Sequence, residues 1–289
     1  MKKFGVSTHL YHGERLQRQH LMDIASRGFE TVEVFATRSH VDYHDAAAIQ
    51  SLARWLDDAA IQLHSVHAPI LDSLVNDKRG RAYSTATRDH SAREATLHEM
   101  DAALDIARQI PFKFFVLHLG LPLAQQPGPD DNNRQAALKT IEHVYERAQP
   151  LGVTLALEVM DNPLSTTPAL VDMLEHDLDG LDIGLCMDVG HAHMLGDTAD
   201  AIETASEYLV TTHIHDNRRQ KDDHLVPFEG SINWDATIME LEKIGYDGVL
   251  MYEVRNRESA AQVLDRCVRA RKTLDSLAGN WELEAGSFS

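Results

Sequence analysis

The chain has 289 residues, 43% of them hydrophobic, so we expect a large core. Its two cysteines are far apart in the sequence, which indicates no disulfide framework and a reducing cytoplasmic location. Its net charge of −18 disfavours a broad basic surface for nucleic acid or for an anionic membrane. No apolar run approaches the ~18 residues of a membrane span, and the first residues, MKKFGVSTHL, lack the apolar segment of a signal peptide.

Eight short apolar runs recur along the chain, and their enrichment in Val, Ile, Leu and Phe predicts a β-strand at each. The predicted strands are, in chain order, Phe4–Leu10, Thr31–Ala36, Gln62–Ala68, Lys113–Gly120, Thr154–Met160, Ile183–Val189, Leu209–Asp216 and Gly248–Val254. A segment with helical periodicity follows each strand. These predicted helices are Leu16–Arg27, Ala46–Ala60, Ser91–Arg108, Asn133–Gln149, Pro168–His176, Thr198–Tyr208, Trp234–Ile244 and Glu258–Ala278.

The strand–helix alternation indicates an α/β protein with a parallel sheet. Eight such units close naturally into a (β/α)8 TIM barrel, which we predict as a single domain over residues 1–278, with residues 279–289 as a C-terminal tail. The alternative, an open doubly wound sheet, would need a glycine-rich first turn. The segment from His9 to Gly13 has no such fingerprint.

The stretch from Leu209 to Gly230 carries the first sign of a metal site. His213 and His215 are two residues apart on a predicted strand, so their side chains share one face. Asp222 and His224 follow in the next loop. Imidazole and carboxylate groups are common ligands of zinc and similar ions, so this stretch predicts a metal site.

Side chains able to bind metal occur at or near the carboxyl ends of six consecutive predicted strands. They are His67, His118, Glu158, Asp188, His191, His213, Asp222, His224 and Glu253. In a barrel these ends share the rim that carries the active site. Because burying uncompensated carboxylates is costly, a cation among them is the simplest physical explanation. We expect Cys186 and Met187, which precede Asp188, to pack outward against helices.

The sequence resembles the xylose isomerase-like TIM barrels, the superfamily that joins sugar isomerases and epimerases with endonuclease IV. The motifs that carry the resemblance are LEV at Glu158, DVGH at Asp188–His191, HIHDN at His213, DDHL at Asp222–His224, the following FEGSINW and YEV at Glu253. The sugar-epimerase branch implies one divalent metal on Glu158, Asp188, His213 and Glu253. The endonuclease IV set of nine ligands for three zinc ions implies five more, His67, His118, His191, Asp222 and His224.

The surrounding sequence resembles the sugar-isomerase branch in VEVFATRSHVDYHD and HDNRR, and it lacks the glycine-rich first loop and DNA-penetrating loops of endonuclease IV. The resemblance therefore implies a metal-dependent sugar or sugar-phosphate isomerase or epimerase. Glu158 and Glu253 would transfer a proton at the carbon next to a chelated carbonyl. The candidate substrate-binding residues are His9, Glu33, His191 and Arg218.

Two other functions stay open. One is an endonuclease IV-like zinc phosphodiesterase, in which Glu158 bridges two ions of a centre that holds two or three. The other is a non-catalytic barrel with a structural metal, which the absence of cysteine ligands disfavours. Across these functions we expect one to three ions per chain. Zinc and manganese fit the ligand types about equally, with magnesium and cobalt also open. We expect a small sugar-like substrate, no nucleic-acid or membrane partner, and a homodimer as one option for assembly.

Overall fold

A computed structural model describes residues 2–75 and 78–286, with side-chain surroundings up to residue 279. Eight parallel strands close into a barrel in the order β1-β10-β9-β8-β7-β6-β3-β2. The strands are β1 (Lys3–Ser7), β2 (Thr31–Phe35), β3 (Gln62–His67), β6 (Phe114–Leu117), β7 (Thr154–Glu158), β8 (Ile183–Asp188), β9 (Leu209–Ile214) and β10 (Val249–Tyr252). This arrangement confirms the predicted single-domain TIM barrel.

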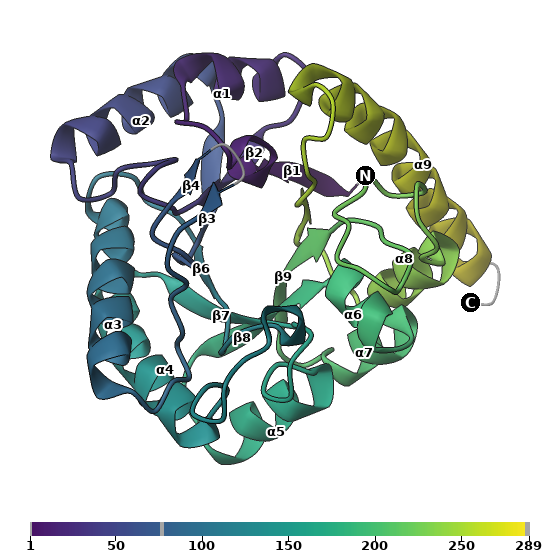
Figure 1. The fold of residues 1–289 in the computed structure, drawn as a ribbon. Coiled ribbons are helices and arrows are strands. Elements are labelled where there is room, and N and C mark those ends of the chain that lie inside the picture. The colour runs from purple at the N-terminus through teal and green to yellow at the C-terminus, as the bar shows by residue number, and fades with distance from the viewer. Residues whose placement is uncertain (1, 76–77, 287–289) are drawn as a thin grey trace.

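The helices form a ring around the strands (Figure 1). They are α1 (Arg18–Ala25), α2 (Ala46–Ala59), α3 (His90–Leu104), α4 (Arg134–Ala148), α5 (Thr167–His176), α6 (Val189–Leu195), α7 (Thr198–Thr204), α8 (Trp234–Lys243) and α9 (Ala260–Gly286). The α9 helix continues past Ala278, where the predicted helix ends, and the boundary between barrel and tail stays a prediction. Among the described helices, none combines the length and apolarity that a membrane crossing needs.

Local chemistry explains where several elements begin. Asp45, Asp89 and Asn133 each accept a backbone N–H at the start of α2, α3 and α4. The first strand ends at Ser7, three residues earlier than predicted, because the Ser7 hydroxyl accepts from the backbone N–H of His9 and starts a 3₁₀ turn over Thr8–Tyr11. His9 therefore lies on this turn and not on a strand.

The barrel holds two separate apolar regions. The large one lies between the strands and the surrounding helices and includes Met187. A small one, formed by Phe114, Val116, Ala156 and Cys186, fills the interior beneath the strand ends. The prediction that Cys186 packs outward is wrong, because Cys186 is two residues from Asp188 and shares its inward face.

Two connections depart from simple βα turns. After β3, the strands β4 (Leu74–Val75) and β5 (Lys78–Arg79) form an antiparallel hairpin that the sequence did not predict. After β9, the loop to α8 is organised by the buried carboxylate of Asp216. That carboxylate accepts five N–H groups at 2.8 to 3.2 Å, from the backbones of Asn217, Phe228, Ser231 and Ile232 and from the Trp234 indole. Asp216 thereby fixes the loop that carries Asp222 and His224.

Candidate metal centre and active site

Four buried side chains meet at the carboxyl ends of neighbouring strands. Glu158 ends β7, Asp188 ends β8, His213 lies on β9 and Glu253 follows β10. One ligand atom from each lies within 4.8 Å of the others. The Nδ1 atom of His213 is 3.2 Å from Glu158 Oε1, 3.7 Å from Glu253 Oε2 and 4.0 Å from Asp188 Oδ2. The structure thus brings these four predicted ligands to one centre.

Glu33 sets the orientation of His213 from below. Its Oε2 atom lies 2.9 Å from His213 Nε2 and accepts the Ser65 hydroxyl at 2.8 Å. A carboxylate can only accept here, so His213 carries a proton on Nε2, and Nδ1 is the atom that faces the three carboxylates. A second carboxylate that fixes the tautomer of a ligating histidine is a frequent feature of metal sites.

The electrostatics of this centre fit a divalent cation. Burial, together with the neighbouring Glu158 and Asp188 carboxylates, raises the pKa of Glu253 against the opposing effect of His213 and His224. Burial alone would also raise the pKa of Glu158, but His118 and His213 outweigh it and hold that pKa well below its usual range. Three carboxylates and one imidazole nitrogen form a donor set that suits zinc or manganese, and a cation would relieve the repulsion among the acids.

A second group shares Glu158. His67 Nε2 and His118 Nε2 lie 3.1 Å and 3.0 Å from Glu158 Oε2 and 3.2 Å from each other. The Nδ1 of His67 donates to the carbonyl of Ala68 at 2.9 Å, which leaves Nε2 as the atom facing the carboxylate. The two oxygens of Glu158 therefore face two different groups, as a bridging carboxylate would.

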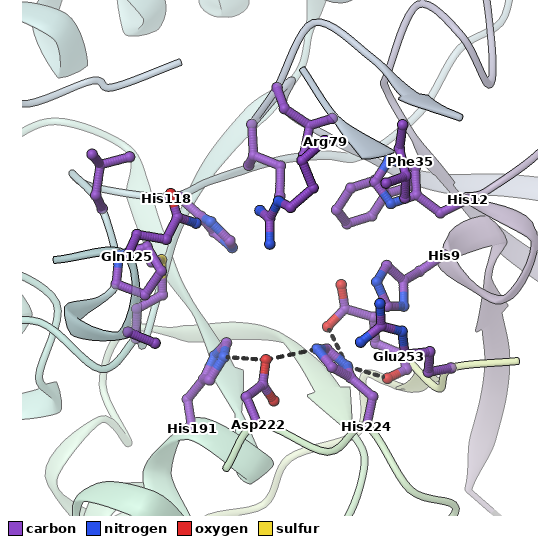
Figure 2. A pocket seen from close by; sticks show the side chains of 18 of the residues that line it. His9, His12, Phe35, Arg79, His118, Gln125, His191, Asp222, His224 and Glu253 are labelled. Carbon is purple, nitrogen blue, oxygen red and sulfur yellow. Dashed lines mark hydrogen bonds and ion pairs between the residues drawn. The ribbon is translucent and has the colours of Figure 1, made fainter. Parts of the chain in front are cut away.

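A third group lies at the side of the cavity, where Figure 2 shows Asp222 between two histidines. Asp222 Oδ2 is 2.9 Å from His224 Nε2 and 3.5 Å from His191 Nε2. Each histidine donates a hydrogen bond from Nδ1 to a backbone carbonyl. His191 donates to Val159 at 3.0 Å, and His224 donates to Glu253 at 2.8 Å. Burial lowers the pKa of His224, but Asp222 outweighs it and raises that pKa to about 9. All nine predicted ligands thus lie in three adjoining groups.

One further histidine belongs to this network without having been assigned a role. His215 Nε2 lies 3.1 Å from both oxygens of Asp188, and its ring stacks on His224 with 4.1 Å between centroids. Any side chain at Gly190 would overlap the His215 ring, so this position requires glycine. The shared face of His213 and His215 was the signal in the sequence, since both side chains point into the barrel.

A cavity of about 700 Å³ lies above these groups, and Glu253, His118, His191, Asp222 and His224 line it. Among the predicted substrate-binding residues, His9 and His191 line the cavity. Glu33 lies buried beneath it, on His213. Arg218 is exposed outside the described lining and donates to the carbonyl of Glu229 at 2.9 Å, so the structure does not bring it to the site. The sequence did not single out Phe35, His12 and Arg255 as lining residues.

Comparisons with known proteins agree with this architecture. The uncharacterized protein MJ1311 of Methanocaldococcus jannaschii is 28% identical over 270 residues, which cover 90% of this chain and 86% of the relative. The L-ribulose-5-phosphate 3-epimerase UlaE of Shigella flexneri is 26% identical over 84% of this chain and 86% of its own. An inosose isomerase of Bacillus subtilis is 21% identical over 64% of this chain and 69% of its own.

Solved structures share the fold. A D-tagatose 3-epimerase-like protein superposes with a TM-score of 0.79 at 24% identity, over 98% of this chain and 99% of that one. The IOLI protein with a bound zinc atom superposes with a TM-score of 0.75 at 17% identity, over 96% of this chain and 99% of that one. The model of the xylose isomerase-like TIM barrel family matches residues 21–277. The chain therefore belongs to the xylose isomerase-like TIM barrel family.

Proposed function

We propose that the chain is a divalent-metal-dependent isomerase or epimerase of a sugar or sugar phosphate, which moves a proton at the carbon next to a carbonyl. The observation that carries this proposal is the position of Glu158 and Glu253, 3.2 Å and 3.7 Å from the same nitrogen of His213. Two carboxylates around one centre can remove a proton from a carbon and return one to it. Relatives named inosose isomerase and L-ribulose-5-phosphate 3-epimerase support this reaction class.

Glu158, Asp188, His213 and Glu253 would hold the ion, with zinc or manganese as the expected metal. A divalent ion in this position supplies Lewis acidity toward the carbonyl and hydroxyl oxygens of a sugar. Glu33 keeps His213 in the tautomer that this role requires.

The other residues bind and shield the substrate. Glu253 lines the cavity and meets the substrate there, whereas Glu158 is fully buried beneath the described lining. His9 donates from Nδ1 to the carbonyl of Val254 at 3.3 Å, which leaves Nε2 for a substrate hydroxyl. Burial, and then the neighbouring His224, hold the pKa of His9 well below its usual range, so the ring is neutral and accepts the hydroxyl hydrogen. Phe35 gives the cavity an apolar wall that excludes water.

Solvent deuterium exchange tests this proposal. The metal-loaded protein is incubated in deuterated water with a panel of ketoses and ketose phosphates, and loss of a C–H signal is followed by NMR. We expect exchange with at least one substrate and a loss of about 10²–10⁴-fold in rate in Glu253→Gln, the usual contribution of a general base. Failure of every sugar and sugar phosphate to exchange would refute the proposal.

A multinuclear zinc hydrolase is the second candidate, and a specific observation favours it. The Oε2 atom of Glu158 meets His67 and His118 at 3.1 Å and 3.0 Å while Oε1 faces His213, which is the arrangement of a carboxylate that bridges two ions. Metal content separates the two functions: one ion per chain supports the isomerase, and two or three support the hydrolase. The cytoplasmic location, the lack of a nucleic-acid partner and the homodimer stay predictions from the sequence.

A further inference from the structure

Two arginines line the cavity beside the candidate metal centre. They are Arg79 on β5 and Arg255 after β10. Figure 2 shows the Arg79 guanidinium directed into the cavity between His118 and Phe35, across from Asp222 and His224. The names of relatives leave open whether the substrate is phosphorylated, because they include both a ribulose phosphate epimerase and an inosose isomerase.

The backbone holds both arginines in place. The hairpin pairs Leu74 with Arg79, and its stem is fixed by Gly80 N–H donating to the Ser73 carbonyl at 2.8 Å and by Leu74 N–H donating to the Ser39 hydroxyl at 2.9 Å. Arg255 donates its own N–H to the carbonyl of His224 at 3.0 Å. The two side chains therefore start from defined positions on the connections that follow β3 and β10.

Among the residues that the structure describes, neither arginine has an acidic partner, although the chain has 45 acidic residues and only 27 lysines and arginines. Throughout the part of the chain that the structure describes, no carboxylate lies within 4.0 Å of either guanidinium, including the four that line the cavity, Glu14, Asp161, Asp222 and Glu253. Other arginines do find such partners; Arg18 meets Asp58 at 2.7 Å, for example. Two cations that line a cavity without a described acidic partner, in so acidic a chain, indicate an anionic ligand.

The two guanidinium groups are also close enough to repel each other. Burial, and then the charge of Arg255, lower the pKa of Arg79. Both arginines also act on His12, whose pKa falls to about 3, mainly through burial, so this histidine adds no third charge. Two guanidinium groups can each donate two N–H groups to the oxygens of a phosphate dianion, whose two negative charges balance both arginines. One carboxylate would balance the charge of only one arginine.

We propose that Arg79 and Arg255 bind the phosphate of a phosphorylated sugar whose carbonyl end lies at Glu158, Asp188, His213 and Glu253. This inference rests on the proposed isomerase or epimerase function and narrows its substrate to a phosphomonoester. The cavity of about 700 Å³ has room for a monosaccharide phosphate between the arginines and the metal centre.

Kinetics with a matched pair of substrates test the inference. Solvent deuterium exchange is measured for ketopentose 5-phosphates and for the same ketopentoses without phosphate. We expect kcat/KM to favour the phosphates, and Arg79→Gln and Arg255→Gln each to lower it about 10–100-fold for the phosphates, mainly through KM, because each loses a charge-assisted contact. Exchange of the unphosphorylated sugars should change little.

Arg81→Gln is the matched control. Arg81 lies on the same hairpin connection, but its guanidinium is placed over the Tyr83 ring, 5.7 Å from the centroid, outside the described cavity lining. It removes the same charge from the protein without touching the proposed subsite. Equal rates for phosphorylated and free sugars, or an equal loss in Arg81→Gln, would overturn the inference.

A binding measurement separates this inference from the reaction. Xylitol 5-phosphate has no carbonyl and cannot react, so calorimetry reports only its binding to the intact protein. Weaker binding in Arg79→Gln and Arg255→Gln supports the subsite even if no sugar exchanges, in which case only the proposed reaction falls. If free sugars exchange and both variants bind xylitol 5-phosphate as tightly as the parent protein, the proposed reaction is supported and the phosphate subsite is refuted.

Discussion

Replacing Glu33 tests whether the buried carboxylate beneath His213 supports a metal site. Glu33 Oε2 is 2.9 Å from His213 Nε2 and 2.8 Å from the Ser65 hydroxyl. Glu33→Gln keeps an amide oxygen for the imidazole N–H but removes the negative charge, and a charge-assisted hydrogen bond is about twice as strong as a neutral one. A hydrogen bond to a charged group contributes ~2–3 kcal/mol, and the variant loses about half of it. The loss of about 1–1.5 kcal/mol should lower the metal affinity roughly tenfold.

Glu33→Ala removes the acceptor altogether and should approach the upper end of the ~10–100-fold range for such outer partners. Zinc and manganese affinities are measured by competition with a chromophoric chelator. Glu240→Gln is the control, because Glu240 is a buried carboxylate that pairs with Lys243 at 3.0 Å, away from the site. Unchanged affinity in both Glu33 variants, or an equal loss in Glu240→Gln, would refute the role of Glu33.

Three further predictions concern stability, each measured as the free energy of unfolding in urea. Asp216→Asn should destabilise the chain by about 2–4 kcal/mol, because an amide group cannot accept all five N–H groups, the Trp234 indole among them; a loss below ~0.5 kcal/mol would contradict this. Gly190→Ala should cost about 1–3 kcal/mol through overlap with the buried His215 ring, despite the better helix propensity of alanine, and a stabilised variant would contradict it. Burial lowers the pKa of His40 from 6.5 to about 4, so the unfolded chain binds more protons than the folded chain between these pH values. The free energy of unfolding should therefore fall by up to about 3 kcal/mol as the pH drops from 6.5 to 4. His40→Gln should show a shallower decline, and a pH profile identical to that of the parent protein would rule this out.

The fold could be predicted because it depends on repeated local patterns. Alternating apolar strands and amphipathic helices recur eight times, and closure of eight such units into a barrel follows from their number. The nine candidate ligands could be predicted for the same reason, since residues at the ends of parallel strands must share one rim. The pairing of Asp188 with His213 across β8 and β9 is one such consequence.

The errors in the prediction have separate causes. The β4–β5 hairpin has only two residues in each strand, too few for a periodic signal. Cys186 was expected to point outward, but it is two residues from Asp188 on the same strand, so the two side chains share the inward face. Arg218 was expected near the substrate because the HDNRR motif resembles the sugar-isomerase branch, but loop geometry turns its side chain to the carbonyl of Glu229.

Metal analysis tests the central claim most directly. The protein is purified without chelator, incubated with zinc or manganese, freed of loose ions and analysed for elements beside Asp188→Asn. The account predicts at least one divalent ion per chain in the parent protein and a marked loss in the variant. A parent protein that retains no divalent ion would contradict the claim that Glu158, Asp188, His213 and Glu253 form a metal centre.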